Sequence, residues 1–333
     1  MASNVEFGAQ TEAREVVEAF FEVIRDKTIL ITGVSPNGLG AAIAHELATQ
    51  APALLILTGR DSVKVEAIIT ELAVEFPTVK TRALIFDISS FASTNAAAAQ
   101  VLAYPESSID IIINNAGVMN IPTRTLSTDG FEMQLSVNYL GAFLFTNSIM
   151  PKLLASKAAR IANITSNGYA LSPFRFNDFN FENPSSLTED QKPSKKNCEA
   201  FGVPWGLDYI PPIAYGQSKT AMILYTHELA VKLKGTNITA ACCNPGATKT
   251  GLWRQMPVEV RESIFKVFPM KSHSQGAATP LITTLDPKLP SGAYLDDSQV
   301  QDVAEHASDS ETAEALWALS EKLIGRTFDW SLI

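Results

Sequence analysis

The sequence predicts an α/β protein in which one doubly wound parallel sheet carries helices on both faces. The first observation is a set of short apolar runs, at residues 28–32, 53–58, 83–86, 109–113, 160–165 and 238–243. Each run is apolar on successive positions rather than alternating, which is typical of a strand covered by helices on both sides. The second observation is that stretches of helical length and apolar spacing separate the runs, among them 41–50, 62–76, 131–156 and 214–234. This alternation predicts repeated βαβ units and therefore a sheet of the Rossmann type.

A single domain of this kind is expected over residues 27–333, because no low-complexity tract or Gly/Ser linker divides the chain. Residues 1–26 combine acidic and apolar residues at helical spacing and are expected to form a helical extension. Residues 169–212 break the rhythm and are rich in Pro, Asn, Phe and Ser, so they are expected to be a long insertion that acts as a substrate lid. Residues 251–333 are expected to lie on the substrate side.

Composition excludes several classes of partner. The 26 basic and 35 acidic residues give a net charge of −9, which repels phosphate backbones, so no nucleic-acid partner is expected. No window approaches the roughly 20 apolar residues of a membrane span, and no secretory leader is recognisable, so a cytoplasmic protein is expected. The three cysteines share no ligand spacing with the four histidines, and no metal site is expected.

A glycine-rich loop follows the first apolar run. Its glycines permit a tight turn and allow backbone N–H groups to approach a pyrophosphate at the start of a helix. An ordinary strand-to-helix turn is the alternative, but the position after the first strand of a βαβ series favours phosphate binding. The residues expected to contact the cofactor are Gly33, Ser35, Asn37, Gly38, Leu39 and Gly40.

The end of the second apolar run predicts the choice of cofactor. An acidic residue at this turn would bind the adenosine ribose of NAD, whereas this chain has Arg60. A guanidinium binds a 2′-phosphate by a charge-assisted hydrogen bond, so NADP(H) is predicted. Two alternatives stay open: the adjacent Asp61 pairs with Arg60 or reaches the ribose itself, or Arg60 is a plain surface residue.

Tyr215 and Lys219 are four positions apart at the start of a predicted helix, which places them on one face, one turn apart. A nearby ammonium favours the phenolate, so the pKa of Tyr215 is expected to fall toward the working pH. Ser166 follows the fifth apolar run, at the sheet edge where open α/β folds bind ligands. Together these residues predict acid/base chemistry on an oxygen atom.

The ordered motifs resemble the short-chain dehydrogenase/reductase family over roughly residues 27–250. They are the glycine-rich loop, Asn114-Asn115-Ala116-Gly117, Asn138, Ser166, Tyr215 with Lys219, and Pro245-Gly246. Residues 58–60, 167–176 and 215–219 look most like the retinol-dehydrogenase-like and WW-domain-oxidoreductase-like branch, which acts on apolar alcohols, aldehydes and ketones. The loop departs from the family pattern, because four residues rather than three separate its first two glycines.

The resemblance implies a role for each matching residue. Tyr215 would donate or abstract the proton, Ser166 would hold the substrate oxygen, and Lys219 would bind the nicotinamide ribose. Asn138 would hold a water in a proton relay. The adenosine half of the cofactor would contact Asp87, Ile88, Asn114, Asn115, Ala116 and Gly117, and the nicotinamide end would contact Pro245, Gly246 and Thr248. For Asn114 the alternative is that it ties neighbouring strands together.

The family also pairs two helices between subunits, here 131–156 and 214–234, which implies a homodimer or homotetramer unless their apolar stripes are core. The expected function is an NADP(H)-dependent oxidoreductase that interconverts a carbonyl and an alcohol on an apolar substrate. The alternative is a non-redox enzyme on the same scaffold, such as an epimerase, a dehydratase or an enzyme that assists a cyclisation. An idle NADP-binding interaction protein is disfavoured because Tyr215 and Lys219 are both present.

Aromatic residues of the insertion are expected to shape the substrate site. Trp205 and Tyr209 are predicted to influence substrate preference. Phe176, Phe179 and Phe181 have the alternative of anchoring the loop on the sheet edge. The polar stretch 183–200 is the expected mobile part of the lid.

Overall fold

The computed structural model describes residues 2–267 and 269–330, and an eight-stranded sheet is its central feature, in the order β3-β2-β1-β4-β5-β6-β7-β8. Neighbouring strands are parallel except for β8, which is antiparallel to β7. The six predicted strands and the doubly wound parallel sheet are confirmed. The strands are β1 (Thr28–Ile31), β2 (Leu54–Gly59), β3 (Thr81–Ile85), β4 (Ile111–Asn114), β5 (Arg160–Ile164), β6 (Thr239–Cys243), β7 (Tyr294–Asp296) and β8 (Gln299–Gln301). The last two were not predicted, since three residues carry too little periodicity to mark a strand.

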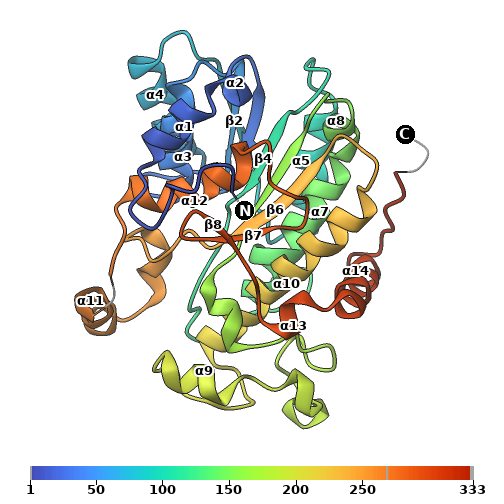
Figure 1. Cartoon of the computed structure of the whole chain (residues 1–333). Helices are drawn as coiled ribbons and strands as arrows, with labels where there is room; N and C mark the ends of the chain where they lie inside the picture. The colour runs from blue at the N-terminus through green and yellow to red at the C-terminus, as the bar shows by residue number, and fades with distance from the viewer. Residues whose placement is uncertain (1, 268, 331–333) are drawn as a thin grey trace.

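Helices cover both faces of the sheet, as predicted (Figure 1). One apolar cluster joins the sheet to α1 (Ala13–Ala19), α3 (Leu39–Ala48), α4 (Ser62–Glu75) and α12 (His273–Leu285). A second cluster on the other face joins it to α5 (Phe91–Leu102), α7 (Gly141–Ser148), α10 (Pro211–Lys232) and α14 (Ser310–Ile324). The remaining helices are α2 (Phe21–Ile24), α6 (Met133–Leu135), α8 (Met150–Leu154), α9 (Lys195–Ala200), α11 (Val258–Val267) and α13 (Glu305–Ser308).

The stretch 131–156, predicted as one helix, is interrupted twice. A π-helical turn, η1 (Ser136–Leu140), lies between α6 and α7, and it contains Asn138. Pro151 lies in the first turn of α8, where an N–H would have no intrahelical partner, and Ile149, with φ −94° and ψ 6°, separates α7 from α8. Such π-turns are frequent at functional sites.

The N-terminal extension contains α1 and α2, and it packs into the domain. Helix α1 contacts α12 and α3. Val16, Val17 and Ile24 are fully buried, and they belong to the apolar cluster on that face of the sheet. Residues 2–26 therefore contribute to the same core as the rest of the described chain.

The apolar stripes of α7 and α10 are core, not exposed. Helix α14 packs on α10, and the Trp317 ring meets the rings of Phe143 and Tyr225 at centroid distances of 4.9 and 5.8 Å. The chain's own C-terminal helix therefore covers the faces on which the expectation of a homodimer or homotetramer depends.

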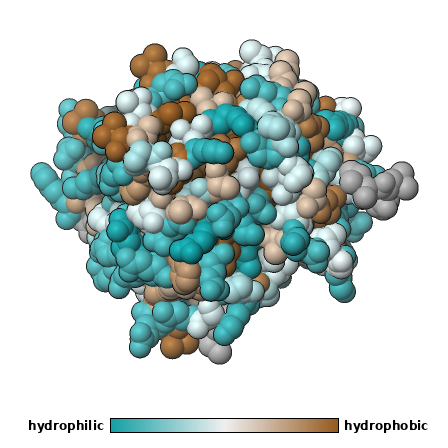
Figure 2. Space-filling view, turned by 90° about the horizontal axis from the view of Figure 1, so that it is seen from above, coloured by the Kyte–Doolittle hydropathy of each residue, from teal (hydrophilic) through white to brown (hydrophobic). Residues whose placement is uncertain are grey.

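Figure 2 shows the face at the N-terminal ends of the central strands, where polar residues predominate and hydrophobic ones form small scattered groups. No helix within residues 2–267 and 269–330 is long and apolar enough to cross a membrane.

Candidate active site

A cavity of about 620 Å³ lies at the carboxyl ends of the central strands, the edge at which open α/β sheets bind ligands. This volume lies within the range of roughly 300–1,000 Å³ that is typical of pockets for cofactors and small molecules. Most of the residues predicted from the sequence line it: Gly33, Ser35, Gly38, Leu39, Arg60, Asp87, Ile88, Asn115, Ala116, Gly117, Ser166, Tyr215, Lys219, Pro245, Gly246 and Thr248. Asn37, Gly40, Asn114 and Asn138 are not among the lining residues.

The extra residue of the glycine-rich loop is absorbed by a turn over residues 35–38. Gly38 N donates to Ser35 O at 3.0 Å, Pro36 follows Ser35, and Asn37 has a φ of +56°. A type II turn requires a positive φ at its third position and often has proline at its second. Asn tolerates a positive φ better than most residues. Ser35 consequently faces the cavity, whereas Asn37 is exposed on the outside of the turn.

The loop forms a cradle in which a side chain would not fit. Gly33 has a φ of +73°, and a Cβ there would lie 2.5 Å from the Cα of Ala116. Helix α3 begins at Leu39 after Gly38, with no side chain capping its first turn. Its first N–H groups are therefore available to an anion in the cavity.

Asp61 does not pair with Arg60. Its carboxylate accepts a hydrogen bond from Lys64 N at the start of α4 and lies 3.2 Å from Lys64 Nζ. These contacts hold the pKa of Asp61 below its ordinary value, with the backbone N–H of Lys64 as the main cause. Arg60 lines the cavity and forms no ion pair with any residue that the structure describes.

Asn114 takes the structural alternative. Its Nδ2 donates to Asn163 Oδ1 at 2.8 Å and to Thr146 Oγ1 at 2.9 Å, and its side chain is buried. It therefore ties β4 to β5 and α7, and the expectation of a direct cofactor contact from its side chain is wrong.

Asn138 does not line the cavity itself but bonds to a residue that does. Its Oδ1 accepts from Val118 N at 2.8 Å, and its Nδ2 donates to Val118 O and to Ser218 Oγ, both at 2.9 Å. Both amide hydrogens are thereby used, so a water in the relay expected from the resemblance would have to donate to an oxygen of Asn138. The π-turn instead directs Asn138 to join the cavity-lining Val118 to Ser218, the residue before Lys219.

Tyr215 and Ser166 meet across Gly168. A Cβ on Gly168 would lie 3.2 Å from two ring carbons of Tyr215 and 3.4 Å from Ser166 Oγ, so a larger residue there would press on both side chains. Burial raises the pKa of Tyr215 to about 12, and the Ser166 hydroxyl opposes the rise. The expected lowering of this pKa is therefore wrong for the protein without ligands, because desolvation dominates. Gly168 directly precedes Tyr169 within the segment 167–176 that carries the family resemblance, but no role in the site was predicted for it.

Lys219 lies over the face of the Tyr215 ring. Its Nζ is 5.5 Å from the ring centroid and donates to Ile164 O at 2.9 Å. Burial lowers the pKa of Lys219 to about 8. The ammonium is thus mostly charged at neutral pH, and its hydrogen bond to the Ile164 carbonyl compensates part of its lost hydration.

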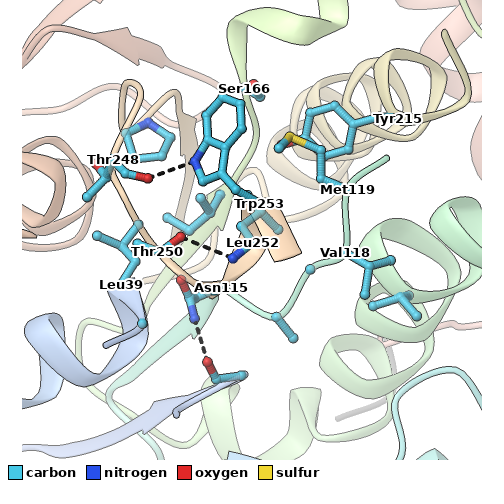
Figure 3. Close-up of a pocket in the computed structure, with 18 of the residues that line it drawn as sticks. Leu39, Asn115, Val118, Met119, Ser166, Tyr215, Thr248, Thr250, Leu252 and Trp253 are labelled. Atoms are coloured by element: carbon cyan, nitrogen blue, oxygen red, sulfur yellow. Dashed lines mark hydrogen bonds between the residues drawn. The ribbon is translucent and has the colours of Figure 1, made fainter. Parts of the chain in front are cut away.

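The cavity is covered by the segment that follows β6. The 3-10 helix η5 (Gly251–Gln255) contributes Leu252, Trp253 and Arg254 to the lining. Figure 3 shows the Trp253 indole on the Ser166 side of the cavity, where its Nε1 donates to Thr248 O at 2.9 Å. No sequence motif singled out these residues, although residues 251–333 were expected on the substrate side.

The insertion 169–212 contributes Leu171, Phe201, Val203 and Pro212 to the cavity. It contains part of η2 (Asn167–Leu171), then η3 (Pro184–Ser186), η4 (Glu189–Gln191) and α9. Phe174 is buried in the core, with Phe176 and Phe179 packed against it, so the anchoring alternative holds for these two rings.

Phe181 is an anchor too, and two other aromatics of the insertion lie away from the cavity. Phe181 is buried beneath the guanidinium of Arg175, 4.0 Å from its ring centroid. Trp205 Nε1 donates to Pro193 O, and the Tyr209 hydroxyl donates to Ile121 O. Neither is among the lining residues, which contradicts their predicted contact with substrate.

Residues 2–267 and 269–330 contain no group of three or more His, Cys, Asp or Glu side chains placed to bind a metal ion. Cys198, Cys242 and Cys243 are free and buried.

Comparison with known proteins agrees with this geometry. The chain matches the short chain dehydrogenase family over residues 27–175 and 207–260. Oxidoreductase fscI of Fusarium equiseti is 38% identical over 244 residues, which cover 72% of this chain and 94% of the relative. Retinol dehydrogenase 12 of Mus musculus is 34% identical over 305 residues, 91% of this chain and 87% of the relative.

Solved structures show the same fold. A crystal structure of an uncharacterized protein from Mycobacterium paratuberculosis has a TM-score of 0.68 and 29% identity, and the match covers 92% of this chain and 96% of that one. The NADP active-site complex of RhlG from Pseudomonas aeruginosa has a TM-score of 0.61 and 21% identity, over 83% and 96% of the two chains. The matching family, the relatives and the sheet together show that this chain belongs to the short-chain dehydrogenase family, in its retinol-dehydrogenase-like branch.

Proposed function

We propose that this chain is an NADP(H)-dependent oxidoreductase that interconverts a carbonyl and an alcohol on an apolar substrate. The observation that carries the proposal is that Ser166, Tyr215 and Lys219 line the same cavity as the glycine-rich loop and Arg60. A proton donor and a site for a dinucleotide therefore share one space.

The residues present fit a dinucleotide. The cradle at Gly33 and the uncapped start of α3 suit a pyrophosphate, and Arg60 suits a 2′-phosphate. Pro245, Gly246 and Thr248 line the same cavity and would meet the nicotinamide end, as the resemblance to the family implies.

The proposed chemistry divides between cofactor and protein. When bound, the reduced nicotinamide supplies a hydride to the carbonyl carbon. Tyr215 donates its proton to the carbonyl oxygen, and Ser166 orients that oxygen by a hydrogen bond. The Lys219 ammonium stabilises the phenolate that Tyr215 becomes. In the oxidative direction the phenolate accepts the proton of the alcohol.

An apolar substrate is supported by the lining near the reacting residues. Its side chains there are Met119, Leu171, Phe201, Val203, Leu252, Trp253, Met256 and Ile264. The printed names of the retinol dehydrogenase relatives point to the same class of alcohol.

Turnover of NADPH with a panel of apolar aldehydes and ketones tests the proposal. Tyr215→Phe should reduce turnover roughly 10²- to 10⁴-fold, as loss of a general acid does, while the Kd for NADPH stays within a few-fold. Tyr209→Phe is the matched control, because its hydroxyl bonds to Ile121 O outside the cavity. Turnover of Tyr215→Phe close to that of the wild type would contradict the assignment.

The stoichiometry of the reaction separates redox chemistry from the alternative. A reductase oxidises one NADPH for each product molecule, whereas an epimerase or dehydratase on the same scaffold leaves the total NADPH unchanged. Binding of NADPH without conversion of any substrate in the panel would favour a non-catalytic protein.

Arg60→Ala tests the choice of cofactor. Loss of a charge-assisted hydrogen bond should weaken NADPH binding roughly 10- to 100-fold and leave NADH binding nearly unchanged. Equal losses for the two cofactors would remove the argument for NADP(H).

The proposal includes a lid, formed by the polar stretch 183–200 of the insertion. Limited proteolysis with and without NADPH and substrate tests it. Protection confined to this stretch supports closure over the ligands, whereas cleavage that ignores them identifies a passive insertion.

A further inference from the structure

Two arginines from distant parts of the chain line the same cavity. Arg60 follows β2, and Arg254 belongs to η5 in the segment that covers the cavity. Burial lowers the pKa of Arg254, and the like charge of Arg60 lowers it further, so the two guanidinium groups act on each other. Two cations that face one cavity without a shared anion repel each other.

The acidic residues of the lining do not neutralise this pair. Asp61 pairs with Lys64 and caps α4, and Asp87 accepts hydrogen bonds from the backbone and hydroxyl of Ser89. Arg254 Nη1 donates to Gly251 O at 2.8 Å, inside its own turn. Neither Arg60 nor Arg254 forms an ion pair within the part of the chain that the structure describes. No carboxylate of the described residues therefore neutralises the two arginines, and an anionic ligand would.

Arg254 belongs to a segment that is packed as a unit, here called the flap, residues 249–267. The ends of the flap are brought together where Lys271 N donates to Ala247 O at 2.8 Å and Thr248 bridges to Lys271. Within the flap, the Trp253 and Phe265 rings lie 5.4 Å apart, and Lys249 Nζ lies 5.1 Å from the Phe265 centroid. Arg254 directly follows Trp253 in η5, and Figure 3 shows the Trp253 indole on the Ser166 side of the cavity, so one packed segment carries both residues.

We propose that Arg254 is a specificity-determining residue that binds the 2′-phosphate of NADP together with Arg60. The inference rests on the proposed NADP(H) function and deepens it. One phosphate would replace the repulsion between the two arginines with two charge-assisted hydrogen bonds. The flap that covers the substrate site is then held closed by NADP and not by NAD.

Binding of 2′,5′-ADP and of 5′-AMP, measured by calorimetry, tests the inference without turnover. The two probes differ by the 2′-phosphate alone. Arg254→Ala should weaken 2′,5′-ADP roughly tenfold, the loss of one charge-assisted hydrogen bond, and leave 5′-AMP within twofold. Arg261→Ala is the matched control: it removes a cation from the same flap, pairs with Glu262 at 3.7 Å, and is outside the lining, so both affinities should stay unchanged.

The outcomes separate the inference from the function on which it rests. If Arg60→Ala weakens 2′,5′-ADP and Arg254→Ala does not, Arg254 has no part in the site and the NADP(H) proposal stands. Equal weakening of both probes by Arg254→Ala would also overturn the inference, since it would indicate a general field effect. If the wild type binds 2′,5′-ADP no more tightly than 5′-AMP, the preference for NADP(H) itself is wrong.

Discussion

Replacing Lys219 by methionine should abolish turnover and change how stability depends on pH. The pKa of Lys219 falls from its ordinary value of 10.5 to about 8 because the ammonium is buried. This difference corresponds to about 3 kcal/mol of destabilisation when the group is charged, at about 1.4 kcal/mol per tenfold change in the protonation equilibrium. The variant removes that cost. It also removes the donor to Ile164 O, which offsets about 1–3 kcal/mol of the gain.

The net change in the free energy of unfolding at neutral pH is therefore small, and the informative measurement is how that change depends on pH. Between pH 8 and 10.5 the unfolded chain binds more protons at this lysine than the folded one, so the wild type gains stability as the pH rises. The variant lacks this gain. The free energy of unfolding of Lys219→Met minus that of the wild type should fall by about 2 kcal/mol between pH 7 and pH 9.5.

Urea unfolding at the two pH values measures this difference. Lys234→Met is the control, because Lys234 is exposed just beyond the end of α10, and its difference from the wild type should not change with pH. A difference for Lys219→Met that is the same at pH 7 and pH 9.5 would refute the reasoning that burial lowers the pKa of Lys219.

Other predictions follow from single contacts. Asn114→Ala should lower the free energy of unfolding by about 2 kcal/mol in urea, because it leaves the buried Asn163 amide without a donor, while the Kd for NADPH stays within a few-fold. Burial raises the pKa of Glu132 from 4.5 to about 7, so the wild type should lose stability in thermal melts as the pH rises through this range, and Glu132→Gln should not. Trp253→Ala should change the ratio of kcat/KM between short and bulky carbonyl substrates, whereas Trp205→Ala should leave it unchanged. Light scattering at micromolar concentration should give the mass of a monomer, because α14 covers the faces of α7 and α10; a dimer mass would show that another surface pairs.

The sequence by itself determined the sheet and most of the cavity. Continuous apolar runs with helical stretches between them allow few arrangements other than a parallel sheet covered on both faces. Because all carboxyl ends of such strands meet at one edge, residues that follow the runs, such as Arg60, Ser166 and Pro245, had to lie near one another. Tyr215 and Lys219 are linked by helical periodicity alone. Each of these inferences depends on local order along the chain.

Only the tertiary structure decided what individual side chains do at that edge. Asn114 and Asn138 match family motifs, yet their amide N–H groups donate to residues as far as 49 and 80 positions away. The pKa of Tyr215 rises, against the expectation from its neighbour Lys219, because burial depends on everything that packs around the ring.

The cover of the cavity was likewise decided by long-range packing. Trp253 and Arg254 carry no motif, and they reach the cavity because the chain after β6 folds back and closes at Thr248 and Lys271. Conversely, Trp205 has the aromatic character of a substrate contact but uses its indole N–H on Pro193 O within the insertion. Local pattern specifies which elements form and which edge they share, because strand and helix periodicity act over a few residues. The direction, burial and ionisation of a side chain depend on groups brought together from distant parts of the chain.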